Sequence, residues 1–211
     1  MKRLLLDLDS YGGTDPLGVF PHFLKKTDEV LAPCLAVVFR QLLLLGSFPV
    51  CWRVANVTPI PKGPPSSSAS NYRPISLTPI LSKVFERLLS VHLGRFMEGR
   101  GVVRPQFAYR EGLGTCDALL CVAHTLQSAL EMGQEARIVQ IDFSDAFDRV
   151  NHQGILFKLC SVEVGGSVVS VLTQFLSNRS QFVVLDGCRR KLVKVSCDFF
   201  FFNDTFQRKM I

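Results

Sequence analysis

The stretch IDFSDAFDRV, residues 141–150, places three carboxylates within seven residues, beside large apolar side chains. Asp142, Asp145 and Asp148 could supply oxygen ligands to a hard cation such as Mg²⁺, which typically binds one or two carboxylates together with substrate phosphates. Other roles stay open from these residues alone. Asp145 stands where a helix is expected to begin and could cap it, and Asp148 could pair with an arginine such as Arg110.

Two basic side chains, Lys62 and Arg73, flank a segment that cannot pack, GPPSSSAS at 63–70. Residues 52–62 alternate as a strand does, and residues 71–79 are extended again, so the pattern predicts a hairpin with an exposed tip. Across such a hairpin, a lysine point charge and a bidentate arginine could hold a triphosphate. The alternative, which the two residues favour when taken alone, is a pair of solvated surface cations.

Apolar periodicity indicates the elements that must position these side chains. ARIVQID at 136–142 alternates with a period of two and is expected to be a buried strand that ends at Asp142. Thr78 is expected to cap the helix that follows the hairpin, with Pro79 in its first position. The spacing predicts helices over much of 1–50 up to Gly46, from 79 to about 99, over 116–132, from about 149 to 160 and over 167–177, and a second hairpin around Asp186–Gly187.

The helix expected at 116–132 has an apolar side. Its members are expected to face inward and are Leu119, Val122, Ala123, Leu126 and Leu130.

The composition describes a globular chain with a core: 211 residues, of which 47% are hydrophobic and 20% charged. A net charge of +6 suits a polyanionic partner without requiring one. Seven cysteines, an odd number without a CxxC pair, predict reduced core thiols and no disulfide partner. Neither a secretory signal nor a sufficiently long apolar segment is evident, so we expect a soluble intracellular protein, cytoplasmic or nuclear, without a membrane partner.

Three longer segments occur in an order that resembles the reverse transcriptases of LINE-type (non-LTR) retrotransposons. They are NYRPISLTPILSKVFERLL at 71–89, QFAYREGLGTCDALL at 106–120 and IDFSDAFDRVNHQGILFKL at 141–159. GSFPVCWRVANVTPIPK at 46–62 is similar to the approach to the fingers in that family. The resemblance covers roughly residues 5–197 and implies an α+β fold, a right-hand polymerase with fingers and an incomplete palm.

The resemblance also implies a domain organisation. It divides the chain into an N-terminal helical extension at 1–50, a fingers-like region at 51–135, a partial palm at 136–197 and an aberrant tail at 198–211.

The site residues follow from the same resemblance. Asp142 would be the first catalytic, metal-binding aspartate, and the backbone carbonyl of Phe143 would assist it. Phe147 would pack under the sugar of the incoming nucleotide, while Lys62 and Arg73 would hold its triphosphate. The remaining positions, template-side or supporting, are Gln106, Arg110, Asp145 and Asp148.

The implied reaction is phosphoryl transfer by two Mg²⁺ ions, with an RNA template, a DNA primer and a dNTP as partners. The chain departs from the family after VKVSC at 193–197. No Gly-Pro-Gln-Gly loop follows, and no adjacent pair of aspartates occurs anywhere in the sequence. We therefore expect a catalytically incomplete fragment. The alternatives are a residual nucleic-acid-binding module without polymerase activity, and an active polymerase if the missing carboxylates are supplied in trans.

Overall fold

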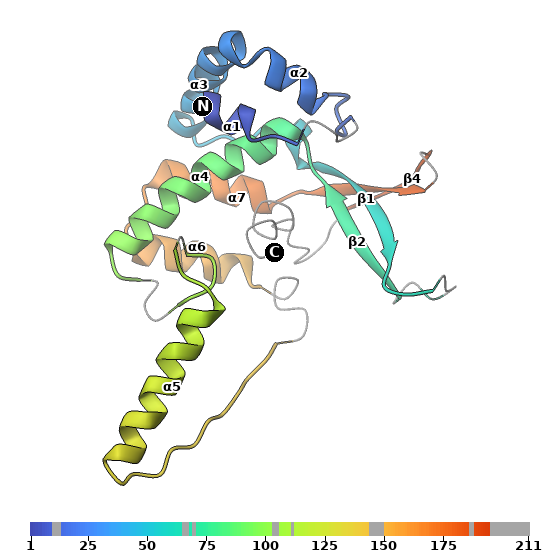
Figure 1. Cartoon of the computed structure of the whole chain (residues 1–211). Coiled ribbons are helices and arrows are strands. Elements are labelled where there is room, and N and C mark those ends of the chain that lie inside the picture. Colours follow the sequence, from blue (N-terminus) through green and yellow to red (C-terminus); the bar gives the residue numbers. More distant parts are fainter. Residues whose placement is uncertain are drawn as a thin grey trace.

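The computed structural model describes residues 1–9, 14–64, 68, 71–102, 106–110, 112–143, 150–185 and 188–194. Within them, helices lie beside a small mixed sheet, which agrees with the expected α+β class (Figure 1). In chain order the elements are α1 (Lys2–Leu6), α2 (Pro21–Lys26), α3 (Asp28–Leu44), the 3-10 helix η1 (Val50–Arg53), β1 (Val54–Pro61), β2 (Tyr72–Leu77), α4 (Ile80–Gly99), α5 (Thr115–Glu131), α6 (His152–Ser161), α7 (Gly166–Leu176), β3 (Ser180–Leu185) and β4 (Cys188–Lys194).

The four described strands form one sheet in the order β2-β1-β3-β4. Strand β1 is antiparallel to β2, and β3 is antiparallel to β4, so both predicted hairpins are confirmed. The two hairpins join through parallel pairing of β1 with β3, which covers only Val54–Val57 of β1. In the described part of the chain, the outer residues of β1, 58–61, pair with β2 alone, and the hairpin extends past the body of the fold (Figure 1).

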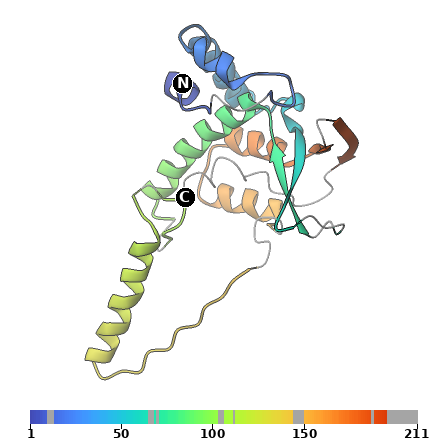
Figure 2. The same cartoon turned by 45° about the vertical axis from the view of Figure 1, so that its right-hand side comes forward.

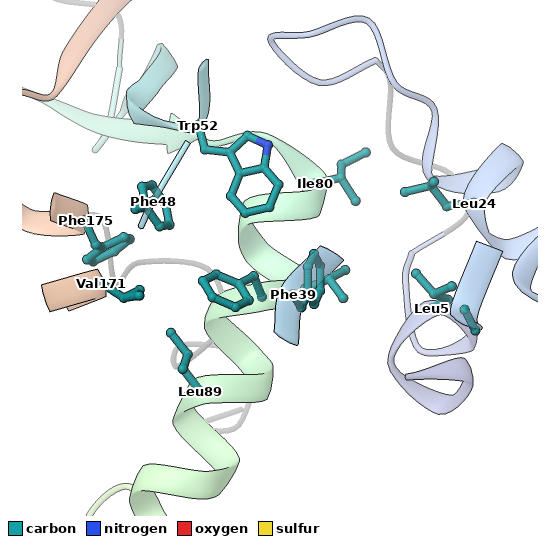
Figure 3. Packing of buried hydrophobic residues seen from close by; sticks show 12 residues of the cluster. Leu5, Leu24, Phe39, Phe48, Trp52, Ile80, Leu89, Val171 and Phe175 are labelled. Atoms are coloured by element: carbon teal, nitrogen blue, oxygen red, sulfur yellow. The ribbon is translucent and has the colours of Figure 1, made fainter. Parts of the chain in front are cut away.

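An aromatic cluster forms the centre of the core (Figure 3). The Phe85 ring of α4 lies 5.0 Å from the Phe39 ring of α3 and 5.9 Å from the Trp52 ring of η1, between centroids. Phe48 joins the cluster and stacks edge-on against Phe175 of α7 at 5.4 Å. Burial of these large rings, with edge-to-face contacts among them, is the main source of stability here. The cluster thereby joins the N-terminal helices to the segment that leads into β1.

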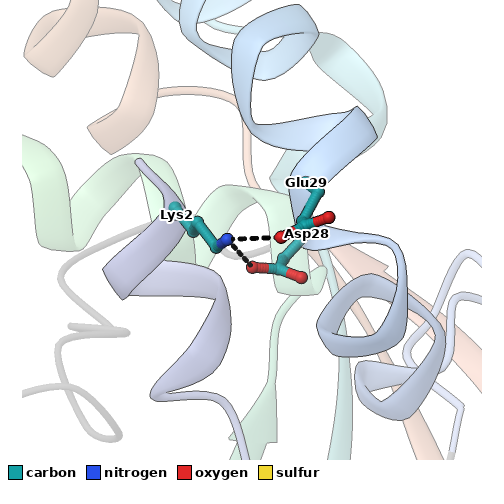
Figure 4. Close-up of polar contacts among 3 residues, drawn as sticks. All are labelled: Lys2, Asp28 and Glu29. Atoms are coloured by element: carbon teal, nitrogen blue, oxygen red, sulfur yellow. Dashed lines mark hydrogen bonds and ion pairs between the residues drawn. The ribbon is translucent and has the colours of Figure 1, made fainter.

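The N-terminal helices add a polar contact at their surface (Figure 4). Lys2 Nζ of α1 lies 2.9 Å from Glu29 Oε1 and 3.7 Å from Asp28 Oδ2, both in the first turn of α3. Its hydrogen bond with Glu29 raises the pKa of Lys2 and lowers the pKa of Glu29. The residues described within 1–50 are mostly helical, as the sequence predicted. This exposed contact adds to the burial of Leu5, through which α1 packs in the core.

The cap of α4 differs from the one expected. Thr78 is buried and makes no capping bond, and Pro79 precedes the helix, which begins at Ile80. The backbone N–H of Ile80 donates instead to Asp15 Oδ2 at 2.8 Å. Asp15 is distant in the sequence, so a local capping pattern could not identify it. A side chain from the N-terminal region therefore satisfies one of the open donors at the start of α4.

The environment of α5 corrects a second expectation. The predicted helix is confirmed to within one residue at each end, but it projects away from the rest of the described fold (Figures 1 and 2). None of its residues is buried, and the side chains of Leu119 and Leu130 are 68% and 66% exposed. The expectation that its apolar side faces inward is wrong for the described structure.

The segment expected as a strand at 136–142 is also corrected. It runs as an extended chain back from the end of α5, with all of its residues exposed, and it pairs with no strand that the structure describes. Its alternation of Ile138, Gln140 and Asp142 suits a sheet, but a strand exists only where a second strand accepts its hydrogen bonds. The prediction of a buried strand is therefore wrong here.

The cysteines differ in part from the expectation. The free thiols of Cys34, Cys51, Cys116, Cys121 and Cys160 are exposed rather than held in the core. None of the described helices is long and apolar enough to cross a membrane.

Candidate nucleotide-binding site

The register of the β1–β2 hairpin places Lys62 and Arg73 on one face. Arg73 lies opposite Ile60, and the N–H of Lys62 donates to the carbonyl of Asn71 at 2.8 Å, which continues the same register by one residue pair. Since opposite residues share a face, Lys62, Ile60 and Arg73 lie on the same side of the ribbon. Such diagonal neighbours are about 7–8 Å apart, within common reach of two long side chains. Both cations are exposed.

The other face of the hairpin explains why the cations point outward. Ala55 and Val57 of β1 and Ser76 of β2 are buried, and they alternate with the face that carries Lys62 and Arg73. A shift of one residue in the register would turn the cations toward the core, where an unpaired charge is costly. The buried residues thus fix which way the two cations face.

A polar network holds the base of the hairpin, and it centres on Gln174 of α7. Gln174 Oε1 accepts hydrogen bonds from Phe48 N at 3.1 Å and from Arg53 Nη2 at 2.9 Å. Gln174 Nε2 donates to the carbonyl of Gly46 at 2.7 Å. Arg53 Nη2 also donates to the carbonyl of Phe48 at 3.0 Å. One side chain of α7 therefore fixes three points of the segment that leads into β1, and sequence analysis did not identify it.

Gly46 permits this close approach to α7. Its φ is +60°, and a Cβ at this position would lie 2.9 Å from Ser170 Cβ. A side chain would therefore both strain the backbone and collide with α7. The predicted end of the helix at Gly46 is correct, since α3 ends at Leu44. The turn also delivers the Gly46 carbonyl to Gln174.

A buried charged side chain, that of Arg179, lies close to the base of the β1–β2 hairpin. Arg179, between α7 and β3, is 5% exposed, and its Nη1 donates to the carbonyl of Phe175 at 2.9 Å. Burial lowers the pKa of Arg179 to about 10. On α4, Ser82 Oγ donates to Glu86 Oε1 at 2.6 Å, and burial of the carboxyl group raises the pKa of Glu86. Sequence analysis missed both residues.

The acidic stretch is described only in part. Asp142 is exposed, and within the described part of the chain its one hydrogen bond is the 2.9 Å bond that Asp142 Oδ1 accepts from the backbone N–H of Phe143. Asp145, Phe147 and Asp148 lie outside the described residues.

The described residues alone do not fit a magnesium ion. They contain no cluster of three or more His, Cys, Asp or Glu side chains that could hold a metal. Asp142 contributes a single exposed carboxylate, whereas a magnesium site with one or two protein carboxylates relies on substrate phosphates for the remainder. We therefore derive no chemical step through a metal.

Gln106 and Arg110, which the resemblance places at template-side or supporting positions, contact each other in one loop. Arg110 Nη1 donates to the carbonyl of Gln106 at 3.1 Å, and Gln106 Nε2 donates to the carbonyl of Ala108 at 2.8 Å. Arg110 Nε also lies 3.6 Å from Glu98 Oε1 on α4. These contacts connect the loop to the end of α4.

Comparisons with known proteins show which family the chain belongs to. The family model described as "Reverse transcriptase (RNA-dependent DNA polymerase)" matches residues 60–196. The RNA-directed DNA polymerase from mobile element jockey of Drosophila melanogaster is 32% identical over 167 residues, which is 77% of this chain and 18% of the relative. Its counterpart from Drosophila funebris is 34% identical over 160 residues, 74% of this chain and 17% of the relative.

A further relative is the probable RNA-directed DNA polymerase from transposon X-element of Drosophila melanogaster, 35% identical over 127 residues, 59% of this chain and 14% of the relative. The chain belongs to the reverse transcriptase family. Within that family it belongs with the RNA-directed DNA polymerases of non-LTR retrotransposons. It spans less than a fifth of the length of these relatives.

Proposed function

We propose that this chain contains the nucleotide-holding part of an RNA-directed DNA polymerase, in which Lys62 and Arg73 bind the triphosphate of an incoming dNTP. The observation that carries this proposal is the register that puts both cations on one exposed face of the β1–β2 hairpin. The chemistry agrees, because a triphosphate suits one compact ammonium charge and one planar guanidinium that can form paired hydrogen bonds. Both residues also lie inside the segment that matches the family.

The remaining family positions extend this proposal. Residues 51–135 would act as the fingers and 136–197 as the start of the palm. Asp142, with the carbonyl of Phe143, would contact a nucleotide-bound Mg²⁺, and Phe147 would lie under the sugar. The supporting positions, around the template and the acidic stretch, would be Gln106, Arg110, Asp145 and Asp148. The net charge of +6 suits an RNA template and a DNA primer.

Nucleotide binding tests the proposal directly. We expect dTTP with Mg²⁺ to bind the wild-type chain, and Lys62→Ala and Arg73→Ala each to weaken binding by about tenfold or more, since a hydrogen bond to a charged group contributes about 1.5–3 kcal/mol. Arg73→Lys should lose part of this affinity because it cannot form the paired bonds. Isothermal titration calorimetry at low and high salt measures both effects.

Matched controls are Lys158→Ala and Arg95→Ala, which remove exposed cations from α6 and α4. They should leave the affinity within about twofold of wild type. Equal weakening by all four alanine variants would reduce the effect to net charge and overturn the proposed site.

Polymerisation itself needs a separate measurement. The sequence contains no adjacent pair of aspartates, and we infer that this chain binds nucleotide and template without extending a primer. Incubation with poly-rA, an oligo-dT primer, dTTP and Mg²⁺ or Mn²⁺ should give no incorporation. Incorporation by the wild-type chain that disappears in Asp142→Ala would show that the chain is an active polymerase. That result would not contradict the proposed nucleotide-binding site.

A further inference from the structure

We propose that Gln174 is a positioning residue for the triphosphate site, acting through the base of the β1–β2 hairpin rather than by touching the nucleotide. This inference rests on the proposed role of Lys62 and Arg73. The hairpin joins the rest of the sheet at one end. Only Val54–Val57 of β1 pair with β3, whereas the outer residues at 58–61 pair with β2 alone within the described chain. The direction of the hairpin is thus fixed at its base.

Gln174 controls that base through three hydrogen bonds. Its Oε1 accepts from Phe48 N and from Arg53 Nη2, and its Nε2 donates to the Gly46 carbonyl, at 3.1, 2.9 and 2.7 Å. Arg53 is the partner nearest to the strand, since it immediately precedes the first residue of β1. Strand β3 follows α7 closely in sequence, so the same helix anchors the beginnings of both parallel strands.

Lys62 and Arg73 lie far from the base of the hairpin, so a small tilt of the hairpin at its base displaces both side chains. Five residues lead from Val57, the last residue of β1 that pairs with β3, to Lys62, and at about 3.3 Å per residue they span about 16 Å. A tilt of about 5° at the base would then move the tip by about 1.4 Å. Displacements of about 1 Å in a reacting group can reduce rates about 100-fold. A triphosphate held by two side chains would be sensitive to the same movement.

The amide of glutamine fits this position because the three partners need both an acceptor and a donor at one point. Leucine has a similar size and supplies neither, and it would leave the part-buried N–H of Phe48 without its acceptor. Glutamate keeps the acceptor for Phe48 and Arg53 but loses the donor to Gly46. The series Gln, Glu, Leu therefore removes the contacts stepwise.

The test compares Gln174→Leu and Gln174→Glu with two controls. Val171→Ala removes a fully buried side chain one turn earlier on α7 and lowers stability without removing a polar contact of Gln174. Gln127→Leu makes the same chemical change on α5, where the glutamine donates to Glu131 at 3.0 Å on the same exposed helix. Circular dichroism at a temperature well below the unfolding transition first establishes that each variant is folded.

Two readouts are then taken on the folded proteins. Gln174→Leu should weaken dTTP binding at least fivefold, and Gln174→Glu by less, while Val171→Ala and Gln127→Leu bind as wild type does. Hydrogen exchange of the hairpin amides of Thr58, Ile60, Arg73 and Ile75, which pair across the hairpin, should accelerate at least fivefold in Gln174→Leu and by less in Gln174→Glu. It should stay unchanged in Val171→Ala and Gln127→Leu. If Gln174→Leu does not fold, Gln174→Glu carries both comparisons.

The outcomes separate this inference from the proposed function. Wild-type affinity and wild-type exchange in Gln174→Leu would overturn the positioning role, as would an equal loss of affinity in Val171→Ala. If Lys62→Ala and Arg73→Ala bind dTTP as wild type does, the proposed triphosphate site is wrong. In that case hairpin exchange alone decides whether Gln174 fixes the hairpin, and unchanged exchange would reject it.

Discussion

Glu86, a half-buried residue of α4, illustrates how the surroundings of one carboxyl group change the pH response of a protein. Its carboxyl group is withdrawn from solvent on α4 and accepts a 2.6 Å hydrogen bond from Ser82 Oγ. Burial raises the pKa of Glu86 above its ordinary value of 4.5, while the Ser82 hydrogen bond and the charges of Arg179 and Lys83 oppose the rise. Burial dominates because charged groups lose more hydration than these partners restore.

A pH-dependent prediction follows for Glu86→Gln. Because the folded state retains the proton to higher pH than the unfolded state does, the contribution of Glu86 to the free energy of unfolding is largest below pH about 4.5 and falls as pH rises through the folded-state pKa. Glutamine is neutral at every pH, so its contribution to the free energy of unfolding does not fall as pH rises. Urea unfolding of both proteins from about pH 4 to pH 8 should show the wild type losing stability relative to the variant as pH rises.

The difference between the two proteins isolates Glu86 from the other carboxylates. Identical pH dependence of wild type and Glu86→Gln would mean that the carboxyl group is not buried in solution. Arg179 should remain charged over this range, since its pKa of about 10 lies above it.

Single residues also show what the sequence could reveal about the candidate site. The placement of Lys62 and Arg73 on the two arms of one hairpin was predictable, because strand alternation and a loop that cannot pack are local patterns. Gln174, in contrast, contacts a segment 121 to 128 residues earlier in the chain. No periodicity within α7 indicates such a partner, so the residue that holds the base of the hairpin could be found only in three dimensions.

At the scale of elements, Asp15 connects the N-terminal region to α4. Asp15 Oδ2 accepts from the N–H of Ile80, and Oδ1 accepts from the backbone N–H groups of Leu17 and Val19 at 2.9 and 2.8 Å. The side chain thereby organises a turn and the start of a helix together. Helix starts need such acceptors because their first N–H groups have no partner within the helix.

Replacing Asp15 should therefore destabilise the whole fold. We expect Asp15→Ala to lower the free energy of unfolding by about 1–2 kcal/mol, the upper range for the loss of a helix cap. Asp15→Asn keeps an acceptor oxygen and should lose less. Chemical denaturation followed by circular dichroism measures the difference. An Asp15→Ala variant as stable as wild type would mean that water replaces the cap without cost.

The helices and strands also show which features the periodicity of the sequence does not predict. The bounds of α4 and α5 were predicted within a residue or two, because the spacing of apolar residues defines a helix. The orientation of α5 was not predicted, because spacing reveals that a helix has an apolar side but not what covers it. For the same reason 136–142 has the alternation of a strand without a described partner.

At the scale of the whole molecule, Phe85 holds separate parts of the chain together. It is fully buried on α4, and its ring contacts the rings of Phe39, Phe48 and Trp52 at 5.0, 6.4 and 5.9 Å. These partners belong to α3, the following turn and η1. Truncating such a side chain removes apolar burial and leaves a cavity where three segments meet.

We therefore expect Phe85→Ala to lower the free energy of unfolding by about 3–5 kcal/mol. Trp52 is the single tryptophan of the chain, so its fluorescence follows unfolding of this region without interference. Phe157→Ala is the matched control, because the Phe157 side chain on α6 is 76% exposed. Its stability should stay within about 0.5 kcal/mol of wild type. Equal losses in both variants would contradict the position of Phe85 at the centre of the core.

The parallel pairing of β1 with β3 bears on how the chain folds during synthesis. Phe48 and Gln174, which meet at the base of this pairing, are 126 residues apart. At about 5–20 residues per second, a ribosome needs about 6–25 s to deliver the second after the first. For that interval the Phe48 ring lacks its contact with Phe175 of α7. The first hairpin can form early, but its anchoring must wait, and the nascent chain needs protection from aggregation until α7 emerges.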